Sequence, residues 1–348
     1  MFTDKDDKKT ELSTLGEFGL IRRLSSSIGI RNPETLKGIG DDAAIIDSGD
    51  KATVVSTDML AEGVHFDLSY VPLKHLGYKA AMVNLSDIYA MNATPKQLLV
   101  SIAVSNRFPL EAIEEMYEGL RAACEMHNTD IVGGDTTSSR SGLILSITAI
   151  GTCDKNDIVY RSAAGENDLI CVSGDLGGAF TGLQILEREK RIFMENPNIQ
   201  PDLGTHTYIL QRQLRPEARK DIIDKLREIG VKPTSMIDVS DGLASELHHI
   251  CTSSGKGCRI YESKIPIDQS TYQVALDLNL DPTVCAMNGG EDYELLFTIR
   301  TSDFEKVQSA IDISVIGHIT SKEEGLVMID KSDHVVPIVA QGWDALRN

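Results

Sequence analysis

The chain is organised around a glycine turn near its amino terminus, which reads Gly38-Ile39-Gly40-Asp41-Asp42-Ala43-Ala44. Two strand-like runs follow, over 43–47 and 52–57, separated by the turn Ser48-Gly49-Asp50. Glycine turns let the backbone approach a bound anion, and open α/β folds place ligand sites at strand ends. The quoted stretch therefore predicts a fold of the α+β or α/β class, with a site at this turn.

The same order of strand, Gly-Asp turn and helix recurs further along the chain. The turns Gly133-Gly134-Asp135 and Gly174-Asp175-Leu176-Gly177 fit it, as does Asp238-Val239-Ser240-Asp241-Gly242. Hydrophobic periodicity and breakers set the other elements. We expect helices over 17–28, 73–91, 109–127 and 216–229, and strands over 98–104, from 130, over 143–150, over 169–173, before 238 and over 294–299.

A polar stretch over 152–166 separates two halves of the chain. Because a domain averages roughly 100–200 residues, we expect an amino-terminal domain over 1–155 and a carboxy-terminal α/β domain over 156–348. Residues 189–206 are rich in Pro, Asn and charge, which predicts an exposed connection.

Composition limits the classes of partner. The 348 residues include 52 acidic and 34 basic ones, a formal net charge of −18 that repels nucleic acid and anionic membranes. No apolar run is long enough to cross a bilayer, and the charged amino terminus lacks the apolar region of a signal peptide. The six cysteines form no C-x-x-C pair, which argues against a zinc cage or a redox dithiol. We expect a cytoplasmic enzyme without nucleic-acid or membrane partners.

Carboxylates gather at the turns and strand ends. Each alone could cap a helix or fill a turn, but the set favours sites for a hard cation such as Mg²⁺. Carboxylates about 5 Å apart repel by roughly 3 kcal/mol at an effective dielectric near 20, so such a cluster needs cations. The set comprises Asp41, Asp42, Asp58, Asp87, Asp135, Asp175, Asp238, Asp241, Glu291 and Asp292.

Asp87 is the most informative of these acids. It continues a line of apolar residues at helical spacing, which runs from Leu73 through Ala80 and Val83. A carboxylate on such a buried face is costly unless it is paired or binds a metal. A hydrogen-bonded core aspartate remains the alternative.

Common motifs of phosphate chemistry are missing from the sequence. It has no G-x-x-x-x-G-K-[ST] loop and no H-R-D or D-F-G set, which excludes P-loop NTPases and protein kinases. His248 and His249 are adjacent on an expected helix, so their side chains diverge and we interpret them as structural.

Eight motifs in this order resemble the thiamine-monophosphate kinases, a family within the PurM-like superfamily that includes aminoimidazole ribonucleotide synthetase. The resemblance runs from Gly38 to the end of the chain, with no departure at these positions. The motifs are Gly40-Asp41-Asp42-Ala43-Ala44, Ser56-Thr57-Asp58, Gly63-Val64-His65-Phe66, Asn84-Leu85-Ser86-Asp87, Gly133-Gly134-Asp135-Thr136, Ser173-Gly174-Asp175-Leu176-Gly177, Asp238-Val239-Ser240-Asp241-Gly242 and Gly289-Gly290-Glu291-Asp292-Tyr293-Glu294-Leu295.

The resemblance implies a kinase that moves the γ-phosphoryl group of ATP to thiamine monophosphate. It implies amino-terminal strands that form a barrel across a homodimer, and ATP with several Mg²⁺ ions between the two domains. Residues that would bind Mg²⁺ are Asp41, Ser56, Thr57, Asp58, Asp87, Asp135, Asp238 and Asp241; those that would contact ATP are Tyr117, Gly134, Asp135, Arg161 and Ser240; those that would contact the substrate are His65, Glu291 and Trp343.

The expected chemistry needs no general base. The acceptor phosphate has a second pKa near 6 and is largely ionised at neutral pH. We therefore expect direct transfer without a phosphoenzyme, with catalysis by alignment and charge neutralisation. Trp343 is the only tryptophan, and its aromatic face suits the thiazolium or pyrimidine of the acceptor.

Other functions stay open from the sequence. Aminoimidazole ribonucleotide synthetase, selenophosphate synthetase and a hydrogenase-maturation dehydratase share the superfamily. The selenium enzyme uses a reactive residue near its amino terminus and the hydrogenase factor a carboxy-terminal cysteine, whereas here the first cysteine is Cys124 and the chain ends at Asn348. A non-catalytic module that binds Mg²⁺ and nucleotide is the alternative from another class.

Overall fold

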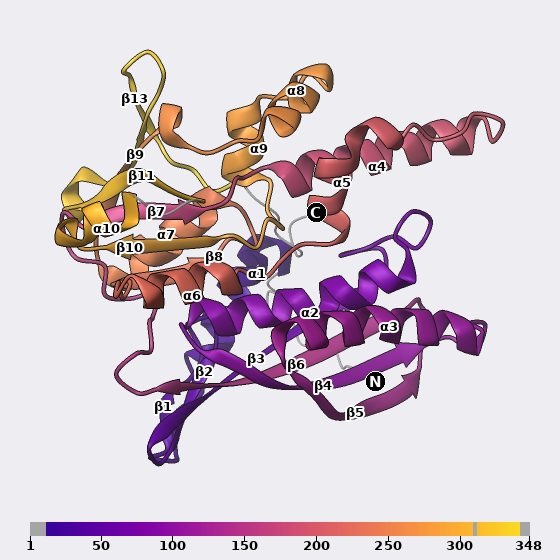
Figure 1. The fold of residues 1–348 in the computed structure, drawn as a ribbon, viewed down its shortest axis with the longest axis horizontal. Coiled ribbons are helices and arrows are strands. Elements are labelled where there is room, and N and C mark those ends of the chain that lie inside the picture. Colours follow the sequence, from indigo (N-terminus) through magenta and orange to yellow (C-terminus); the bar gives the residue numbers. More distant parts are fainter. Residues whose placement is uncertain (1–11, 309–311, 342–348) are drawn as a thin grey trace, which may run out of the picture.

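Two mixed sheets form the framework of the molecule (Figure 1). The computed structural model describes residues 12–308 and 312–341. The first sheet has the strand order β1-β2-β3-β6-β4-β5, and the second β13-β12-β9-β11-β7-β10-β8. The first contains β1 (Thr35–Lys37), β2 (Ala44–Ser48), β3 (Lys51–Ala61), β4 (Thr94–Val104), β5 (Asp130–Ser138) and β6 (Ile144–Asp154). The second contains β7 (Leu169–Ser173), β8 (Ser235–Asp238), β9 (Gly257–Tyr261), β10 (Leu295–Ile299), β11 (Ile313–Thr320), β12 (Leu326–Ile329) and β13 (Val335–Pro337).

Helices α2 (Leu73–Ala90) and α3 (Leu110–His127) cover one face of the first sheet. Side chains alternate along β6, with Leu145, Ile147 and Ala149 buried and their neighbours partly exposed, as expected for a strand with one covered face. Figure 1 shows α2 between the first sheet and the second half of the chain, and α2 is buried along most of its length.

Glycines bring α2 and α3 unusually close together. A Cβ added at Gly77 would lie 1.9 Å from the carbonyl oxygen of Met116, and one at Gly119 would lie 1.8 Å from that of Lys74. Only residues without a Cβ allow this approach, so these two positions fix the separation of the helices.

Helices of the second half surround the second sheet. The strand β7 leads into α4, and β8 leads into α7, as the sequence predicts. The remaining helices are α1 (Leu12–Ser25), α4 (Gly178–Glu195), α5 (Thr207–Leu214), α6 (Lys220–Glu228), α7 (Leu243–Ser254), α8 (Gln269–Asp277), α9 (Pro282–Asn288) and α10 (Phe304–Gln308), with 3-10 turns η1 (Gly204–His206), η2 (Glu262–Lys264), η3 (Thr301–Asp303) and η4 (Lys322–Glu324).

Some predicted boundaries are wrong. Helix α1 starts at Leu12 rather than at 17, with a break at Gly16, and α6 starts at Lys220 rather than Pro216. Helix α4 continues to Glu195, so only the later part of the predicted connection is irregular. Strand β5 runs through Gly133-Gly134-Asp135 instead of ending there. At β5 and α4, packing in the folded chain extends the element past the predicted boundary.

The largest cluster of buried apolar side chains joins both halves of the chain. It includes Leu85 and Ile88 of α2, Ile222 of α6 and Phe297 of β10. The boundary between domains at 155/156 stays a prediction, although β6 ends just before it and β7 begins after it. Within the described residues, no helix is long and apolar enough to cross a membrane.

Candidate functional site

Three carboxylates from distant segments meet where the two halves of the chain pack together. One oxygen each from Asp42, Asp87 and Asp238 lie within 4.8 Å of one another. Asp42 precedes β2, Asp87 lies on α2, and Asp238 ends β8. A turn, a helix and a strand end thus bring together acids that are far apart in the sequence. Asp42 and Asp238 are separated by 196 positions, which is 238 minus 42.

Hydroxyl and amide groups orient this carboxylate cluster. The Ser56 hydroxyl donates a hydrogen bond to Asp87 Oδ2, and the Ser86 hydroxyl donates one to Asp238 Oδ2 at 2.7 Å. Both serines were within the predicted motifs, although only Ser56 was expected to act on a metal. These hydrogen bonds help to fix the orientation of the Asp87 and Asp238 carboxylates.

The metal-free cluster is electrostatically unfavourable. At 4.8 Å and an effective dielectric near 20, each pair of charges repels by about 3 kcal/mol. Burial, and then the charges of Asp58, Asp238 and Asp42, raise the pKa of Asp87 well above its ordinary value. Burial and the charge of Asp42 raise the pKa of Asp238 to about 7.

Asp58 belongs to the same group of carboxylates. Burial and the charge of Asp42 raise its pKa, whereas a hydrogen bond with Asp87 lowers it. Its backbone N–H donates to Asn84 Oδ1 at 3.1 Å, which ties β3 to α2. Hard oxygen donors that repel one another and converge on one point suit Mg²⁺.

Asp41 and Asp42 both contact Arg161, which follows β6. The guanidinium donates from Nε and Nη2 to the two oxygens of Asp42, at 3.1 and 2.7 Å, and the Arg161 N–H donates to Asp41 Oδ1 at 3.0 Å. Asp41 Oδ2 is buried without a hydrogen-bond partner and lies 3.5 Å from Lys37 Nζ. The structure thus places Asp42 at the cluster. Asp42 belongs to the acid set that the sequence singled out as candidate Mg²⁺ sites, but not to the metal ligands that the resemblance implies.

Asp241 lies beside a buried acid that the sequence analysis missed. Its N–H donates to Oε1 of Glu246 at 3.0 Å, and Glu246 is 2% exposed. Burial and the charges of Asp241 and Asp238 raise the pKa of Glu246 well above its ordinary value. In the sequence, Glu246 looks like an ordinary acid in the first turn of α7, so nothing marked it.

The predicted substrate residues His65 and Glu291 lie within electrostatic range of each other. The charge of Glu291 raises the pKa of His65, although burial has the larger effect and lowers it. The Glu291 N–H donates to the carbonyl oxygen of Ser240 at 2.7 Å, which joins a predicted substrate residue to a predicted ATP residue. Lys79, which was not predicted, pairs with Glu291 Oε1 at 2.8 Å.

Other predicted residues lie apart from the carboxylate cluster. Thr57 follows Ser56 on β3, so its side chain faces the other side of the sheet, where its hydroxyl donates to the Ile147 carbonyl oxygen at 3.0 Å. Asp135 and Gly134 lie on the edge strand β5, three strands away from β3, or ~14 Å across the sheet. Tyr117 is partly buried on α3. Trp343 falls outside the described residues.

Two acids of the predicted set have structural contacts instead. Asp292 accepts hydrogen bonds from the N–H groups of Gly177 and Ala179 at the start of α4, at 2.7 and 3.2 Å. Asp175 accepts one from the Tyr208 hydroxyl. The simpler interpretation of a helix-capping acid is therefore correct for Asp292.

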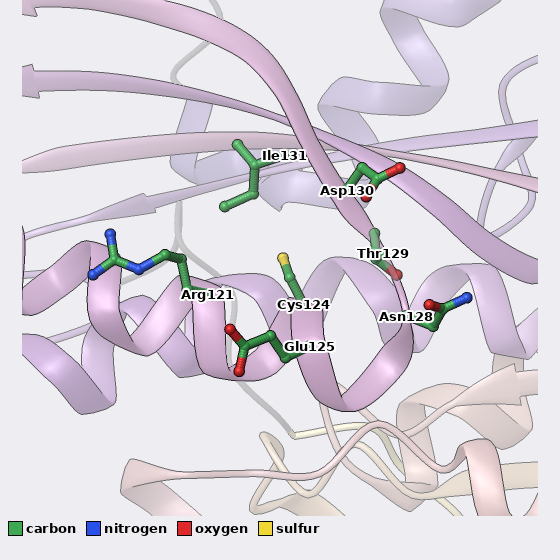
Figure 2. Close-up of a pocket in the computed structure, with 7 residues that line it drawn as sticks. All are labelled: Arg121, Cys124, Glu125, Asn128, Thr129, Asp130 and Ile131. Atoms are coloured by element: carbon green, nitrogen blue, oxygen red, sulfur yellow. The ribbon is translucent and has the colours of Figure 1, made fainter.

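Two cavities border α3 and β5. The first, of about 420 Å³, is lined by Arg121, Cys124 and Glu125 of α3 and by residues 128–131 (Figure 2). The second, of about 530 Å³, is lined by residues 104–106, residues 108–110, Ile113 and residues 136–138. None of the three clustered carboxylates lines either cavity, so these hollows lie outside the cluster itself.

Comparison with known proteins gives the family. Residues 40–153 match the model for "AIR synthase related protein, N-terminal domain". The thiamine-monophosphate kinase of Bacillus subtilis (strain 168) is 34% identical over 339 residues, which cover 96% of this chain and 100% of the relative. The chain belongs to the thiamine-monophosphate kinase family. The member from Aquifex aeolicus (strain VF5) is 32% identical, with coverage of 95% of this chain and 98% of the relative.

Solved structures of this kinase family share the whole fold. The structure described as AaThiL complexed with AMPPCP and TMP is 30% identical, covers 97% of this chain and 99% of its own, and superposes with a TM-score of 0.82. The hydrogenase maturation protein HypE in complex with ATP has a TM-score of 0.66 at 21% identity over 94% of this chain and 96% of its own, which shows a common fold alone. The predicted two-domain PurM-like α/β architecture is confirmed.

Proposed function

We propose that this protein transfers the γ-phosphoryl group of ATP to thiamine monophosphate, giving thiamine diphosphate and ADP. The observation that carries the proposal is the convergence of Asp42, Asp87 and Asp238 within 4.8 Å in a member of the thiamine-monophosphate kinase family. The relative with TMP and AMPPCP, over nearly the whole chain, supports the same pair of substrates.

The carboxylate cluster would hold Mg²⁺. Asp42, Asp87 and Asp238 offer oxygens at one point, with Asp58 against Asp87 and Ser56 bonded to Asp87. When bound there, Mg²⁺ neutralises charge on the polyphosphate and on the group in transfer. The other expected ligands, Asp41, Thr57, Asp135 and Asp241, remain proposals, and a cluster with this charge supports more than one ion.

The protein's own side chains would align the two anions. Arg161 is already committed to both oxygens of Asp42, so it would contact phosphate from one side while it holds a metal ligand from the other. His65 needs no role as a base, because the acceptor phosphate is largely ionised at neutral pH. Transfer would be direct, and a covalently phosphorylated protein would contradict it.

The base of ATP would lie towards α3 and β5. Tyr117 and Gly134 come from these elements, and the cavity of about 530 Å³ includes Thr136, next to Asp135, and Ile113, one turn before Tyr117. Ser240 would contact ATP from the carboxylate cluster's side. His65 and Glu291 would contact thiamine monophosphate, as would Trp343, which lies outside the described residues.

The decisive test is turnover with defined acceptors. The protein, supplied with Mg-ATP and a panel of phosphorylated metabolites, should form ADP and thiamine diphosphate with thiamine monophosphate alone. Formation of ADP only with another acceptor would favour a different PurM-like activity, and no ADP with any acceptor would favour a non-catalytic module.

Asp58→Asn tests the role of the carboxylate cluster. We expect kcat to fall by at least about 100-fold with the fold intact, because the variant removes one carboxylate that faces Asp87. Asp50→Asn, in the exposed turn between β2 and β3, is the matched control and should leave kcat unchanged. Wild-type kcat for Asp58→Asn at saturating Mg²⁺ would refute a role in binding the catalytic metal.

We also propose that two chains pair through the face of the first sheet that α2 and α3 leave uncovered. That face carries Met59, which is 59% exposed, together with the partly exposed Val55, Leu99 and Ile150. An apolar sheet face of this kind is typical of an interface. A barrel made by two such faces would also bring the Asp135 of one chain nearer to the carboxylate cluster of the other.

Light scattering on Met59→Glu tests the pairing. We expect the wild type to be a dimer and the variant to shift towards monomer, because a buried carboxylate would oppose the sheet contact. Met194→Glu, at a position that is 71% exposed on α4, is the control and should remain dimeric. A dimer that persists in Met59→Glu would place the interface elsewhere.

A cytoplasmic location, expected from the sequence, also stays a prediction.

A further inference from the structure

Lys79 is a buried cation for which the sequence analysis gave no role. It lies on α2, is 3% exposed, and its ammonium donates to the Gln213 carbonyl oxygen at 3.2 Å. Lysine is almost never buried without a compensating partner. Among residues 12–308 and 312–341, Lys79 forms an ion pair with Glu291, at 2.8 Å between Nζ and Oε1.

Both oxygens of Glu291 are held in place. Lys79 contacts Oε1, and Gln213 Nε2 donates to Oε2 at 2.8 Å. The backbone of Glu291 is fixed as well, since its N–H bonds to the Ser240 carbonyl oxygen and its φ is 59°. Each carboxylate oxygen can accept a second hydrogen bond, and the Glu291 side chain is 28% exposed, so it remains open to a ligand.

A hydrogen-bond donor lies in the same region. His65 Nδ1 accepts the backbone N–H of Ala61 at 3.1 Å, which places the proton of a neutral ring on Nε2. Burial lowers the pKa of the His65 imidazole, and the charges of Glu291 and Lys79 also act on it, so the ring lies within electrostatic range of this ion pair. A fixed acceptor and a ring N–H form a complementary pair for a 4-aminopyrimidine, whose amine donates and whose ring nitrogen accepts.

We propose that Lys79, assisted by Gln213, is a positioning residue that holds the Glu291 carboxylate to accept a hydrogen bond from the exocyclic amine of the acceptor's pyrimidine. The inference rests on the proposed function and names a determinant of its specificity. An acceptor with a carbonyl in place of the amine would set oxygen against oxygen at Glu291. An acceptor that leaves a polar group of the site without a hydrogen-bond partner binds much more weakly. The site therefore selects amino over oxo pyrimidines.

Lys79→Met is the principal test, because methionine keeps the length of the stem and removes the charge. With thiamine monophosphate, the KM for the acceptor should rise about tenfold, as the lost charged hydrogen bond implies, while the KM for ATP stays within about twofold. The preference for thiamine monophosphate over its 4-oxo analogue should fall in kcat/KM. Lys79→Arg, which restores a cation, should recover part of the preference.

A double variant separates positioning from packing. If Lys79 acts through Glu291, then Lys79→Met combined with Glu291→Gln should be no worse in acceptor KM than Glu291→Gln alone. Gln213→Met removes the second donor and should shift acceptor KM in the same direction. It keeps the proposal testable if Lys79→Met fails to fold.

Lys74→Met is the matched control on the same helix. Lys74 pairs with Glu118 at 3.2 Å, with both side chains about half exposed, so its loss should leave both KM values and the amino preference unchanged. A lowered melting temperature for Lys79→Met with unchanged acceptor KM and preference would show that Lys79 only packs α2 against α5, and would overturn the proposal.

Calorimetric binding of thiamine monophosphate without ATP keeps this inference distinct from the proposed function. Binding that is intact in the wild type and weaker in Lys79→Met supports the role of Lys79 even if no thiamine diphosphate forms. If the wild type forms thiamine diphosphate and both proteins bind thiamine monophosphate equally well, the role of Lys79 is refuted and the proposed function stands. If the wild type does not bind the acceptor, both proposals fail.

Discussion

Asp238→Asn should stabilise the metal-free protein and disable the metal-loaded one. Asp238 is 3% exposed, and burial with the charge of Asp42 raises its pKa from 3.8 to about 7. The Ser86 hydroxyl donates a hydrogen bond to Asp238 Oδ2 at 2.7 Å. The side-chain oxygen of asparagine can accept the same hydrogen bond. The variant therefore removes a charge without removing this hydrogen bond.

The size of the effect follows from the two pKa values. The folded-state pKa lies above the unfolded value, so the penalty is absent below about pH 4 and grows as the pH rises to about 7. The difference between 3.8 and about 7 corresponds to about 4 kcal/mol at about pH 8. For 348 residues at ~2.1 cal/mol/K each, the unfolding entropy is ~0.7 kcal/mol/K, so the melting temperature should rise by about 6 °C.

Thermal unfolding in a chelator is the assay. The gain of Asp238→Asn should be about 6 °C near pH 8 and about 2 °C near pH 5, because the wild-type carboxyl is then largely protonated in the folded protein. Added Mg²⁺ should raise the melting temperature of the wild type more than that of the variant, which has lost one of three clustered carboxylates.

Two results would refute this reasoning. A variant that melts below the wild type at about pH 8 in chelator would mean that Asp238 is not under charge repulsion. An equal response of both proteins to Mg²⁺ would mean that the carboxylate cluster does not bind the cation.

Two further predictions concern Arg161 and the packing of α2. Arg161→Lys should raise the KM for ATP about tenfold, because lysine replaces the two contacts to Asp42 by one; initial rates at varied ATP check this, and an unchanged KM contradicts it. Gly77→Ala should cost roughly 3 kcal/mol, because its Cβ would lie 1.9 Å from the Met116 carbonyl oxygen. Gly204→Ala meets nothing within 4 Å and should be neutral, so equal melting temperatures for the two alanine variants would show that α2 and α3 can separate.

Much of the fold could be predicted because local periodicity agrees with it. The predicted helices over 73–91 and 109–127 match α2 and α3 closely, and the strand over 169–173 coincides with β7. These elements have one covered face or a fully buried one, so the apolar pattern follows the packing. Pro216 misled the start of α6, since it resembles a first-turn proline but lies before the helix.

The site was predictable only where a motif carried the residue. Asp87 stood out because it interrupts an apolar helix face, and the structure places it in the carboxylate cluster. Lys79 lies on α2 and pairs with Glu291 from a distant segment, whereas Glu246 on α7 accepts from Asp241, five residues before it, and is buried by the rest of the fold. Single positions on a helix do not reveal such partners, because burial is decided by what packs against the helix.

Helix α2 carries Lys79 and Asp87 on one rigid element. Eight residues at ~1.5 Å rise set these positions ~12 Å apart along the axis, and α3 packs closely against the same helix at Gly77. If one end of the acceptor binds at Glu291 and its phosphate must reach the carboxylate cluster, the helix fixes the distance between these two binding points. We expect acceptors with a shorter or longer bridge between ring and phosphate to bind at one end and miss the other, so that length is selected as strictly as ring chemistry.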